Sequence, residues 1–412
     1  MLGEFRSKAF FRKVEYCCWN KMHILSIIRL TTNPLGLKLY KLKALYTMFK
    51  SVVSQDSAAH QSSIATDVSY ATNKKNIHFP FDFDQWYPRL EKLTFPSQIL
   101  PISTDTAKAM VKFYQVTFLG KGHLSQEDMK QIRALEKTVA KIMAVNYLNK
   151  DVFIRMSNRS PKDGIPLKEL EKSSFKKYDE IVNSDLDSNQ KMIMLTELQM
   201  QNLRCTSAQE VLNLLLSSER VYSDLQLALE CSARKEDKWS TSLVIRSWEP
   251  NLRQDQEFRL FIYQNQLTAI TQYNPYCRYP SLNESIKTQE KLKIKFKDFV
   301  EQHQATIGAD NYILDIAYIH DEIKVIELNP YDQTTGPCLF SWHKDEQILR
   351  GENPEEIPVI RVRQELLPDL DKWIEIMLDE QKAISCGELM SRPYYKILSE
   401  AEESAPHSSP ML

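Results

Sequence analysis

Glycine is scarce in this chain: only 9 of its 412 residues are glycines, and neither a GxGxxG nor a GxxxxGK(S/T) pattern occurs. Rossmann-type and Walker-type nucleotide sites depend on such glycines, because the backbone amides must approach the phosphates closely. The sequence therefore disfavours both of these nucleotide sites.

The patterns that mark disulfide frameworks, zinc sites and membrane spans are also missing. The 7 cysteines are an odd number and include no CxxC, and the 8 histidines form no HxH or HxxxH group. We therefore expect a reduced intracellular protein without zinc. No uncharged apolar run approaches the ~20 residues of a transmembrane helix, so we expect no transmembrane segment.

The composition is that of an ordinary folded protein, with 42% hydrophobic residues, 26% charged residues and a formal net charge of -1. Such a balanced charge gives no support for direct binding to nucleic acid. The length is sufficient to bury a core in one large domain or in several lobes.

Residues 1–70 differ from the rest of the chain and are predicted to form a basic extension followed by a polar linker. Residues 1–50 contain ten basic and two acidic residues, and the stretch NPLGLKLYKLKALYTMFKSVV suggests an amphipathic helix. A surface helix explains this pattern. Contact of residues 1–53 with a membrane surface, or targeting to an organelle, explains it as well.

Two lobes and a tail are predicted to follow. We expect an N-terminal lobe with a helical insertion at residues 77–242 and a C-terminal lobe at residues 243–395. In the first lobe, periodicity marks a helix at residues 125–148 and a buried strand at residues 151–157. The second lobe has strand-like runs joined by short polar turns, among them QNQ and HDE. The segment 396–412 is predicted to be disordered.

The run KVIELNPYDQTTG, residues 324–336, carries the clearest chemical signal. Pro330 ends a strand, and Glu327 and Asn329 project from one face because alternate strand residues do so. A hairpin through HDE brings them close to Asp315 in the run YILDIAYI. Carboxylate and amide oxygens are ligands that Mg²⁺ prefers, so a magnesium site is predicted here. Taken alone, the pattern also fits a hydrogen-bonded strand end.

Basic residues elsewhere in the chain suit a polyphosphate. Arg155 lies in the strand-like run FIRMS, and Lys162 lies in the polar loop that follows it. A second strand-like run, EFRLFIY, carries Glu257 and Arg259. Each residue by itself also fits a surface salt bridge. Their order along the chain is what favours a nucleotide site.

That order resembles the ATP-grasp superfamily. It runs from a basic strand with its loop through helices to a hinge, a Glu-bearing strand, an Asp-bearing strand and E-x-N. The resemblance implies an α+β fold in which two lobes, with mainly antiparallel sheets, clamp ATP. It implies that Mg²⁺ is held by Asp315, Glu327 and Asn329. It also implies that ATP is bound by Arg155, Lys162, the hinge residues Ile245, Arg246, Ser247 and Trp248, and by Glu257 and Arg259.

Within that superfamily the chain is similar to the cell division cycle protein 123 family. The matching segments extend over about residues 77–345 and include FIRMSNRSPKDG, LVIRSWEP, EFRLFIYQNQLTAITQY, YILDIAY and KVIELNP. The resemblance implies a cytoplasmic protein that binds ATP and magnesium. It further implies an assembly chaperone for translation initiation factor 2 that binds the gamma subunit of this factor.

Two residues depart from the family pattern. Members usually carry Lys in a P-K-L-N-W stretch where this chain has Arg155, and Asp in D-F-N where it has Glu327. Arginine keeps the positive charge but presents it as a planar fork rather than as a compact point charge, so the geometry around phosphate differs.

Other functions fit the same residues. One is an active ATP-dependent ligase that forms an acyl-phosphate on a carboxylate, although no residue is assigned as catalytic. Another is a protein-modifying enzyme or a bacterial effector that is secreted and acts in the cytoplasm of a host. A fold with an inactive site is disfavoured because all three predicted metal ligands are present.

Overall fold

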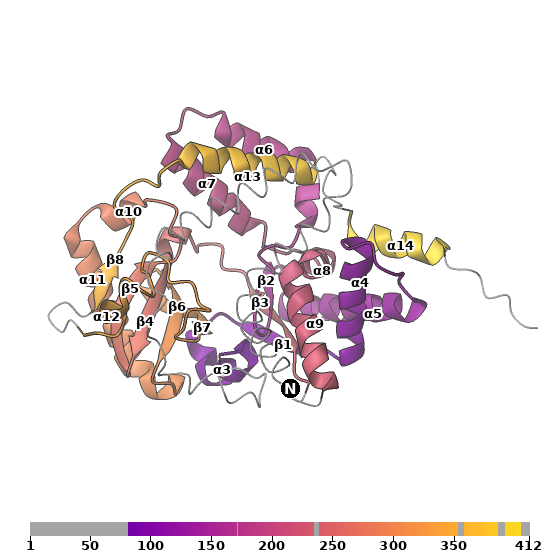
Figure 1. Ribbon diagram of the computed structural model, residues 1–412, viewed down its shortest axis with the longest axis horizontal. Helices are drawn as coiled ribbons and strands as arrows, with labels where there is room; N and C mark the ends of the chain where they lie inside the picture. The colour runs from indigo at the N-terminus through magenta and orange to yellow at the C-terminus, as the bar shows by residue number, and fades with distance from the viewer. Residues whose placement is uncertain (1–80, 171, 235–238, 353–357, 386–391, 405–412) are drawn as a thin grey trace, which may run out of the picture. The chain divides into compact units, whose positions relative to one another are not determined.

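The frame of the described chain consists of two β-sheets with helices packed against them (Figure 1). The structure is a computed structural model that describes residues 81–170, 172–234, 239–352, 358–385 and 392–404. The predicted extension at residues 1–70, with the segment 1–53 proposed to contact membranes, lies outside these ranges. So do residues 405–412 of the predicted tail.

The first sheet separates two hydrophobic cores. It contains β1 (Ser97–Pro101), β2 (Val152–Met156) and β3 (Ser242–Ser247) in the order β1-β3-β2, and both pairs are antiparallel. The side chains of Leu243 and Ile245 pack in one core, whereas Val244 between them packs in the other. Because both faces of β3 are covered, its sequence is an unbroken apolar run rather than an alternation.

The second sheet has the order β7-β6-β4-β5-β8, and only the β5–β8 pair is parallel. It is built from β4 (Glu257–Tyr263), β5 (Gln266–Gln272), β6 (Tyr312–Ile319), β7 (Glu322–Asn329) and β8 (Val359–Arg361). The predicted turns QNQ and HDE are confirmed as two-residue hairpin turns. Residues 264–265 and residues 320–321 all have positive φ, which is how such turns follow the twist of the strands.

These sheets confirm the predicted α+β fold with mainly antiparallel sheets. The predicted strand at residues 151–157 corresponds to β2, and the predicted helix at residues 125–148 corresponds to α5 (Gln126–Asn146). The chain leaves the first sheet only after Ser247, the end of β3, and not at residue 243 where the second lobe was predicted to begin. The division into two lobes itself stays a prediction.

Helices cover the first sheet on the side of Leu243 and Ile245. They are α4 (Thr104–Thr117), α5, α8 (Ala208–Ser217), α9 (Glu219–Ala233) and α14 (Tyr394–Ser404). The prediction that the chain is disordered from residue 396 is wrong for residues 396–404, which belong to α14. Tyr394, Ile397 and Leu398 are buried in this core, so apolar contacts stabilise a helix whose C-terminal half is mostly polar.

The second core joins the other face of the first sheet to one face of the second sheet. The helices in it are α3 (Phe83–Leu90), α10 (Pro280–Asn283), α11 (Ile286–Ile307), α6 (Lys172–Val182), α7 (Ser188–Gln201) and α13 (Leu370–Ser385). Helix α13 lies beside α6 and α7 although it is far from them in sequence (Figure 1). Short helical turns are η1 (Glu91–Leu93), η2 (Leu167–Leu170), η3 (Gln254–Gln256) and α12 (Glu346–Leu349).

Among the residues that the structure describes, no helix combines the length and the apolar character that crossing a membrane requires.

Helix α5 begins with a complete capping box. The hydroxyl of Ser125 accepts a hydrogen bond from the amide of Asp128, and the Asp128 carboxylate accepts one from the amide of Ser125. We expect Ser125→Ala to lower the free energy of unfolding by about 1 kcal/mol, because one amide of the first turn loses its partner. Urea denaturation measures this. Ser125→Asp keeps an acceptor and should cost much less, and equal losses for both variants would contradict the capping role.

Candidate functional site

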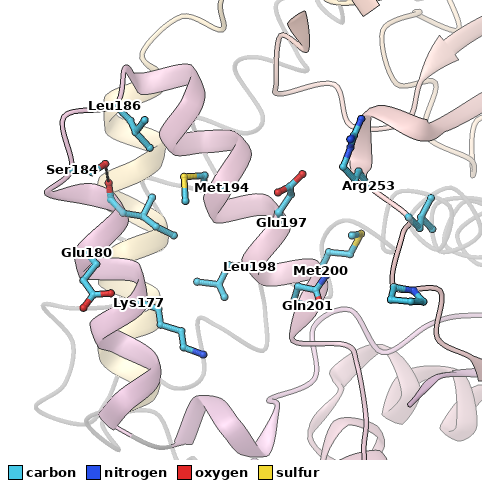
Figure 2. Close-up of a pocket in the computed structure, with 13 residues that line it drawn as sticks. Lys177, Glu180, Ser184, Leu186, Met194, Glu197, Leu198, Met200, Gln201 and Arg253 are labelled. Carbon is cyan, nitrogen blue, oxygen red and sulfur yellow. Dashed lines mark hydrogen bonds between the residues drawn. The ribbon is translucent and has the colours of Figure 1, made fainter. Parts of the chain in front are cut away.

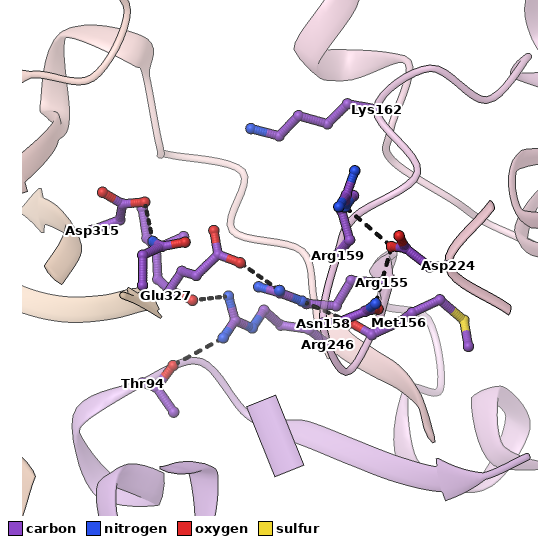
Figure 3. A network of polar contacts seen from close by, with 12 residues as sticks. Thr94, Arg155, Met156, Asn158, Arg159, Lys162, Asp224, Arg246, Asp315 and Glu327 are labelled. Atoms are coloured by element: carbon purple, nitrogen blue, oxygen red, sulfur yellow. Dashed lines mark hydrogen bonds and ion pairs between the residues drawn. The ribbon is translucent and has the colours of Figure 1, made fainter. Parts of the chain in front are cut away.

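An ion pair connects the two sheets at the end of β2. Arg155 is 4% exposed and donates from Nη2 to Oε1 of Glu327 on β7, at 2.5 Å (Figure 3). Its Nε donates to the carbonyl oxygen of Met156 at 3.1 Å. Burial alone would raise the pKa of Glu327, but Arg155 and Lys162 lower it below its ordinary value. Glu327 is therefore a carboxylate that is already paired with a cation.

A second ion pair lies within the second sheet. Arg259 on β4 and Asp315 on β6 are opposite each other in the strand register. They form two parallel hydrogen bonds, Nε to Oδ1 and Nη2 to Oδ2, each 2.7 Å long. The remaining guanidinium nitrogen, Nη1, donates to the carbonyl oxygen of Gly336. Asp315 is 1% exposed, so this bidentate pair compensates a fully buried charge.

The β6–β7 hairpin brings the three predicted metal ligands together. Asp315 is the register partner of Glu327, and Nδ2 of Asn329 donates to Oδ2 of Asp315 at 3.1 Å. The pairing is irregular next to Asp315, where Ile326 is an extra residue in β7. The prediction that these residues are neighbours is confirmed, whereas their role as metal ligands stays a prediction.

The donor chemistry of this trio fits a hard cation. Guanidinium groups already contact both oxygens of Asp315 and one oxygen of Glu327. A carboxylate oxygen has a second lone pair, and the amide oxygen of Asn329 is an additional donor. Among the described residues, no cluster of three His, Cys, Asp or Glu side chains is arranged to hold a metal. The third ligand would therefore have to be an amide.

Lys162 approaches the same cluster from the exposed loop after β2. Its Nζ donates to the hydroxyl of Tyr273 at 2.9 Å and lies 4.8 Å from the centre of the Tyr273 ring. The guanidinium of Arg259 is 5.2 Å from the same ring. Tyr273 raises the pKa of Lys162, so this lysine remains charged. Figure 3 shows Lys162 extended toward the side of the cluster where Asp315 lies.

Sequence reasoning missed Tyr273. It is the residue after β5, and nothing in the run QLTAITQY distinguishes it from an ordinary aromatic at a strand end. Only the fold shows that its ring lies beside two cations from different parts of the chain. Cation–π contacts of this kind hold side chains in place by electrostatic attraction to the ring face.

Glu257 is the first residue of β4 and lies opposite Ala317 of β6. Burial raises its pKa to about 7, Lys162 opposes this rise, and Asp315 adds to it. Glu257 is therefore protonated in part of the molecules near neutral pH. Its predicted contact with ATP stays a prediction.

The predicted hinge residues lie at the end of β3 and just beyond it. Ile245 is fully buried, and its carbonyl oxygen accepts a 2.6 Å hydrogen bond from the hydroxyl of Tyr147. The amides of Ser247 and Trp248 donate to the carbonyl oxygens of Pro96 and Asp151, at 2.8 and 2.9 Å. These backbone groups are thus bonded within the protein.

Arg246 connects the sheets beneath the first ion pair. It is 4% exposed and donates to the carbonyl oxygen of Ile326 at 3.0 Å and to Oγ1 of Thr94 at 3.2 Å. Its guanidinium also lies 4.9 Å from the centre of the Phe83 ring. Burial lowers the pKa of Arg246, as does the like charge of Arg155, but a guanidinium stays protonated at physiological pH. The contacts of Arg246 are therefore structural in this arrangement.

A separate groove lies between α6, α7 and the segment 250–253 (Figure 2). Its volume is about 500 Å³, and apolar side chains such as Met194, Leu198 and Leu252 line it together with Glu197 and Arg253. None of the predicted site residues lines this groove. The nucleotide hypothesis therefore depends on the charged cluster alone.

Comparison with known proteins finds a family to which part of the chain is similar. A model of the D123 family matches residues 192–370, which include β3 to β8 and all three predicted metal ligands. The predicted resemblance to the cell division cycle protein 123 family is thereby confirmed. Arg155 and Lys162 lie outside the matched residues.

Two relatives of this chain are each named "Translation initiation factor eIF2 assembly protein". The Schizosaccharomyces pombe protein is 32% identical over 167 residues, which are 39% of this chain and 50% of that protein. The Xenopus tropicalis protein is 24% identical over 311 residues, 69% of this chain and 82% of that protein. The solved structure of Cdc123 from Schizosaccharomyces pombe is 22% identical, with a TM-score of 0.47, and the similarity covers 69% of this chain and 96% of that one.

The raised pKa of Glu257 predicts a pH-dependent stability. The folded state holds the proton up to a pH of about 7, whereas the ordinary value for the unfolded chain is 4.5. The folded protein thus binds more protons between these values, and its stability falls as the pH rises from 4.5 through 7. We expect wild type to lose about 1–3 kcal/mol relative to Glu257→Gln over this range.

Urea denaturation of both proteins at pH 4.5, 6 and 8 measures this difference. Other titrating groups, such as Asp82, are common to both proteins and cancel in the comparison. A stability difference that does not change with pH would show that folding does not raise the pKa of Glu257.

Proposed function

We propose that this protein binds ATP together with Mg²⁺ and acts in the assembly of translation initiation factor 2. One observation carries the nucleotide part of the proposal: cations from the β2 segment and oxygen donors from the β6–β7 hairpin converge on one cluster. Arg155 and Lys162 come from the first, and Asp315, Glu327 and Asn329 come from the second. The names of two relatives, which are eIF2 assembly proteins, support translation initiation factor 2 as the proposed client.

The charges of the cluster suit a triphosphate with a divalent cation. Arg155 and Lys162 would supply N–H donors for charge-assisted bonds to phosphate oxygens, whereas the three nitrogens of Arg259 are already bonded to Asp315 and Gly336. Asp315, Glu327 and Asn329 would hold Mg²⁺ through oxygen atoms. Mg²⁺ held there would supply positive charge that offsets the negative charge of the phosphates.

The gamma subunit of translation initiation factor 2 is the partner that we propose, on the basis of the resemblance to the cell division cycle protein 123 family. Assembly of that factor would place the protein in the cytoplasm. An assembly role requires that ATP is bound but not that it is hydrolysed. A nucleotide that stabilises one arrangement of the two sheets also stabilises any binding surface that this arrangement forms.

Nucleotide binding can be tested directly by calorimetry. We expect a micromolar dissociation constant for ATP with Mg²⁺, about 8 kcal/mol of binding free energy. Lys162→Ala should weaken ATP binding about tenfold or more, and AMP binding much less, because a cation near the outer phosphates interacts mainly with these. Arg155→Ala should likewise weaken the binding of ATP more than the binding of AMP.

The matched control is Lys297→Ala. Lys297 is exposed on α11, and its ion pair with Glu301 is long at 3.8 Å. This variant should bind ATP as wild type does. Equal losses of ATP and AMP binding in Lys162→Ala would place Lys162 away from the outer phosphates, and unchanged binding would remove it from the site.

The client can be tested with purified initiation factor 2 gamma subunit. We expect immobilised wild-type protein to retain the subunit, and Lys162→Ala to retain less of it at an ATP concentration that saturates wild type only. If the amount of gamma subunit retained does not depend on ATP, binding of the subunit is independent of binding of the nucleotide. ATP hydrolysis that starts only when a carboxylate substrate is added would instead favour the ligase.

A further inference from the structure

Tyr273 and Lys162 come from segments that follow strands of different sheets, and they bond to each other. Lys162 lies in the loop after β2, and Tyr273 is the residue after β5. The ammonium Nζ donates to the phenol oxygen at 2.9 Å. We propose that Tyr273 is a positioning residue that holds the Lys162 ammonium where the outer phosphates of a nucleoside triphosphate bind, and thereby favours a triphosphate over a monophosphate. The inference rests on the proposed nucleotide function.

The backbone that carries the phenol is held by hydrogen bonds. The Tyr273 amide donates to the carbonyl oxygen of Glu257 at 2.9 Å. The residue before it, Gln272, is fully buried. The Gln272 side chain donates to the carbonyl oxygen of Cys277 and accepts from the amide of Arg363, each at 2.8 Å. The phenol oxygen is therefore presented from a fixed place at the end of the second sheet.

The backbone next to Lys162 is held as well. The Asp163 carboxylate accepts a 2.6 Å hydrogen bond from the hydroxyl of Ser218, the N-cap residue of α9. Gly164 packs so closely on α8 that an added Cβ would collide with the carbonyl oxygen of Leu214. The freedom that remains at Lys162 is that of its long, flexible side chain.

The bond to Tyr273 removes much of this remaining freedom before a nucleotide arrives. A lysine side chain that is ordered only on binding loses conformational entropy at that step, which weakens the affinity. A side chain that is already ordered avoids the loss. An ammonium has three N–H donors, so one bond to a phenol leaves donors for phosphate oxygens.

The partner of Lys162 is also uncharged, unlike the partners of the two arginines beside it. Arg155 is paired with the carboxylate of Glu327, and Arg259 is paired with that of Asp315. A carboxylate offsets the positive charge that a phosphate would meet, whereas a neutral phenol accepts a hydrogen bond and leaves the charge of the lysine in place. Tyr273 thus orders the cation without neutralising it.

Calorimetry with ATP and with AMP, both in the presence of Mg²⁺, tests this inference. Tyr273→Phe removes only the hydroxyl and should weaken ATP binding about fivefold while AMP binding stays the same. Tyr273→Leu also removes the ring that lies 4.8 Å from Nζ of Lys162, so it should weaken ATP binding further. Tyr318→Phe is the matched control, because it removes a hydroxyl that bonds to Asp321 at 2.6 Å in the exposed HDE turn, and it should change neither affinity.

A double-mutant cycle shows whether Tyr273 acts through Lys162. In a Lys162→Ala background, Tyr273→Phe should cause no further loss of ATP affinity, because no ammonium is left to position. If the fivefold loss persists in that background, Tyr273 acts on the nucleotide or on the fold by another route, and the positioning role is refuted.

The reactivity of Lys162 gives a readout that needs no nucleotide. We expect acetic anhydride to acetylate Lys162 about fivefold more slowly in wild type than in Tyr273→Phe, because the bonded ammonium is less available as a free amine. Mass spectrometry of the peptide measures this rate, with Lys297 in the same samples as the reference. Equal rates would overturn the inference. Unchanged ATP binding in both Tyr273 variants would overturn it alone, whereas no ATP binding by wild type would overturn the proposed function together with it.

Discussion

The compensation of charge buried between the two sheets is the constraint on which the site depends. Arg155 and Arg246 enter this region from the first sheet, and each is 4% exposed. Removing such groups from water is costly unless they are paired or hydrogen-bonded. The β7 strand supplies the partners: the carboxylate of Glu327 for one arginine and the carbonyl oxygen of Ile326 for the other. The two sheets are thus joined by polar contacts as well as by an apolar core.

The irregular pairing of β7 makes both contacts available from one edge strand. Ile326 is the extra residue in the pairing with β6, and β7 has no strand on its other side in the described sheet. An edge strand has backbone groups that no neighbouring strand satisfies. Thr94 and Arg246 satisfy two of them, at Val325 and Ile326. The strand that carries two of the predicted metal ligands is therefore held in place by Thr94 and by Arg246 of the first sheet.

The ion pair between Arg155 and Glu327 would link ligand binding at the proposed site to the contact between the two sheets. A ligand that changes the partner of Glu327 changes an interaction that holds the sheets together, so ligand binding and the geometry of the two sheets are thermodynamically coupled.

The sequence by itself determined the local structure. Alternation placed Glu327 and Asn329 on one face, the HDE turn paired their strand with that of Asp315, and helical periodicity identified α5. These inferences succeed because strand alternation, hairpin turns and helix periodicity are properties of neighbouring residues. The same reasoning failed for α14, where a polar segment is helical because Ile397 and Leu398 are buried against distant helices.

Only the tertiary structure decided which charges meet. Arg155 and Glu327 are separated by 172 residues, and Lys162 and Tyr273 by 111. Nothing within either segment specifies its partner, because a buried arginine can be compensated by any carboxylate or carbonyl oxygen that packing brings close. For the same reason the sequence could not show that the guanidinium of Arg246 bonds to Thr94 and Ile326, and the predicted contact of Arg246 with a nucleotide stays a prediction.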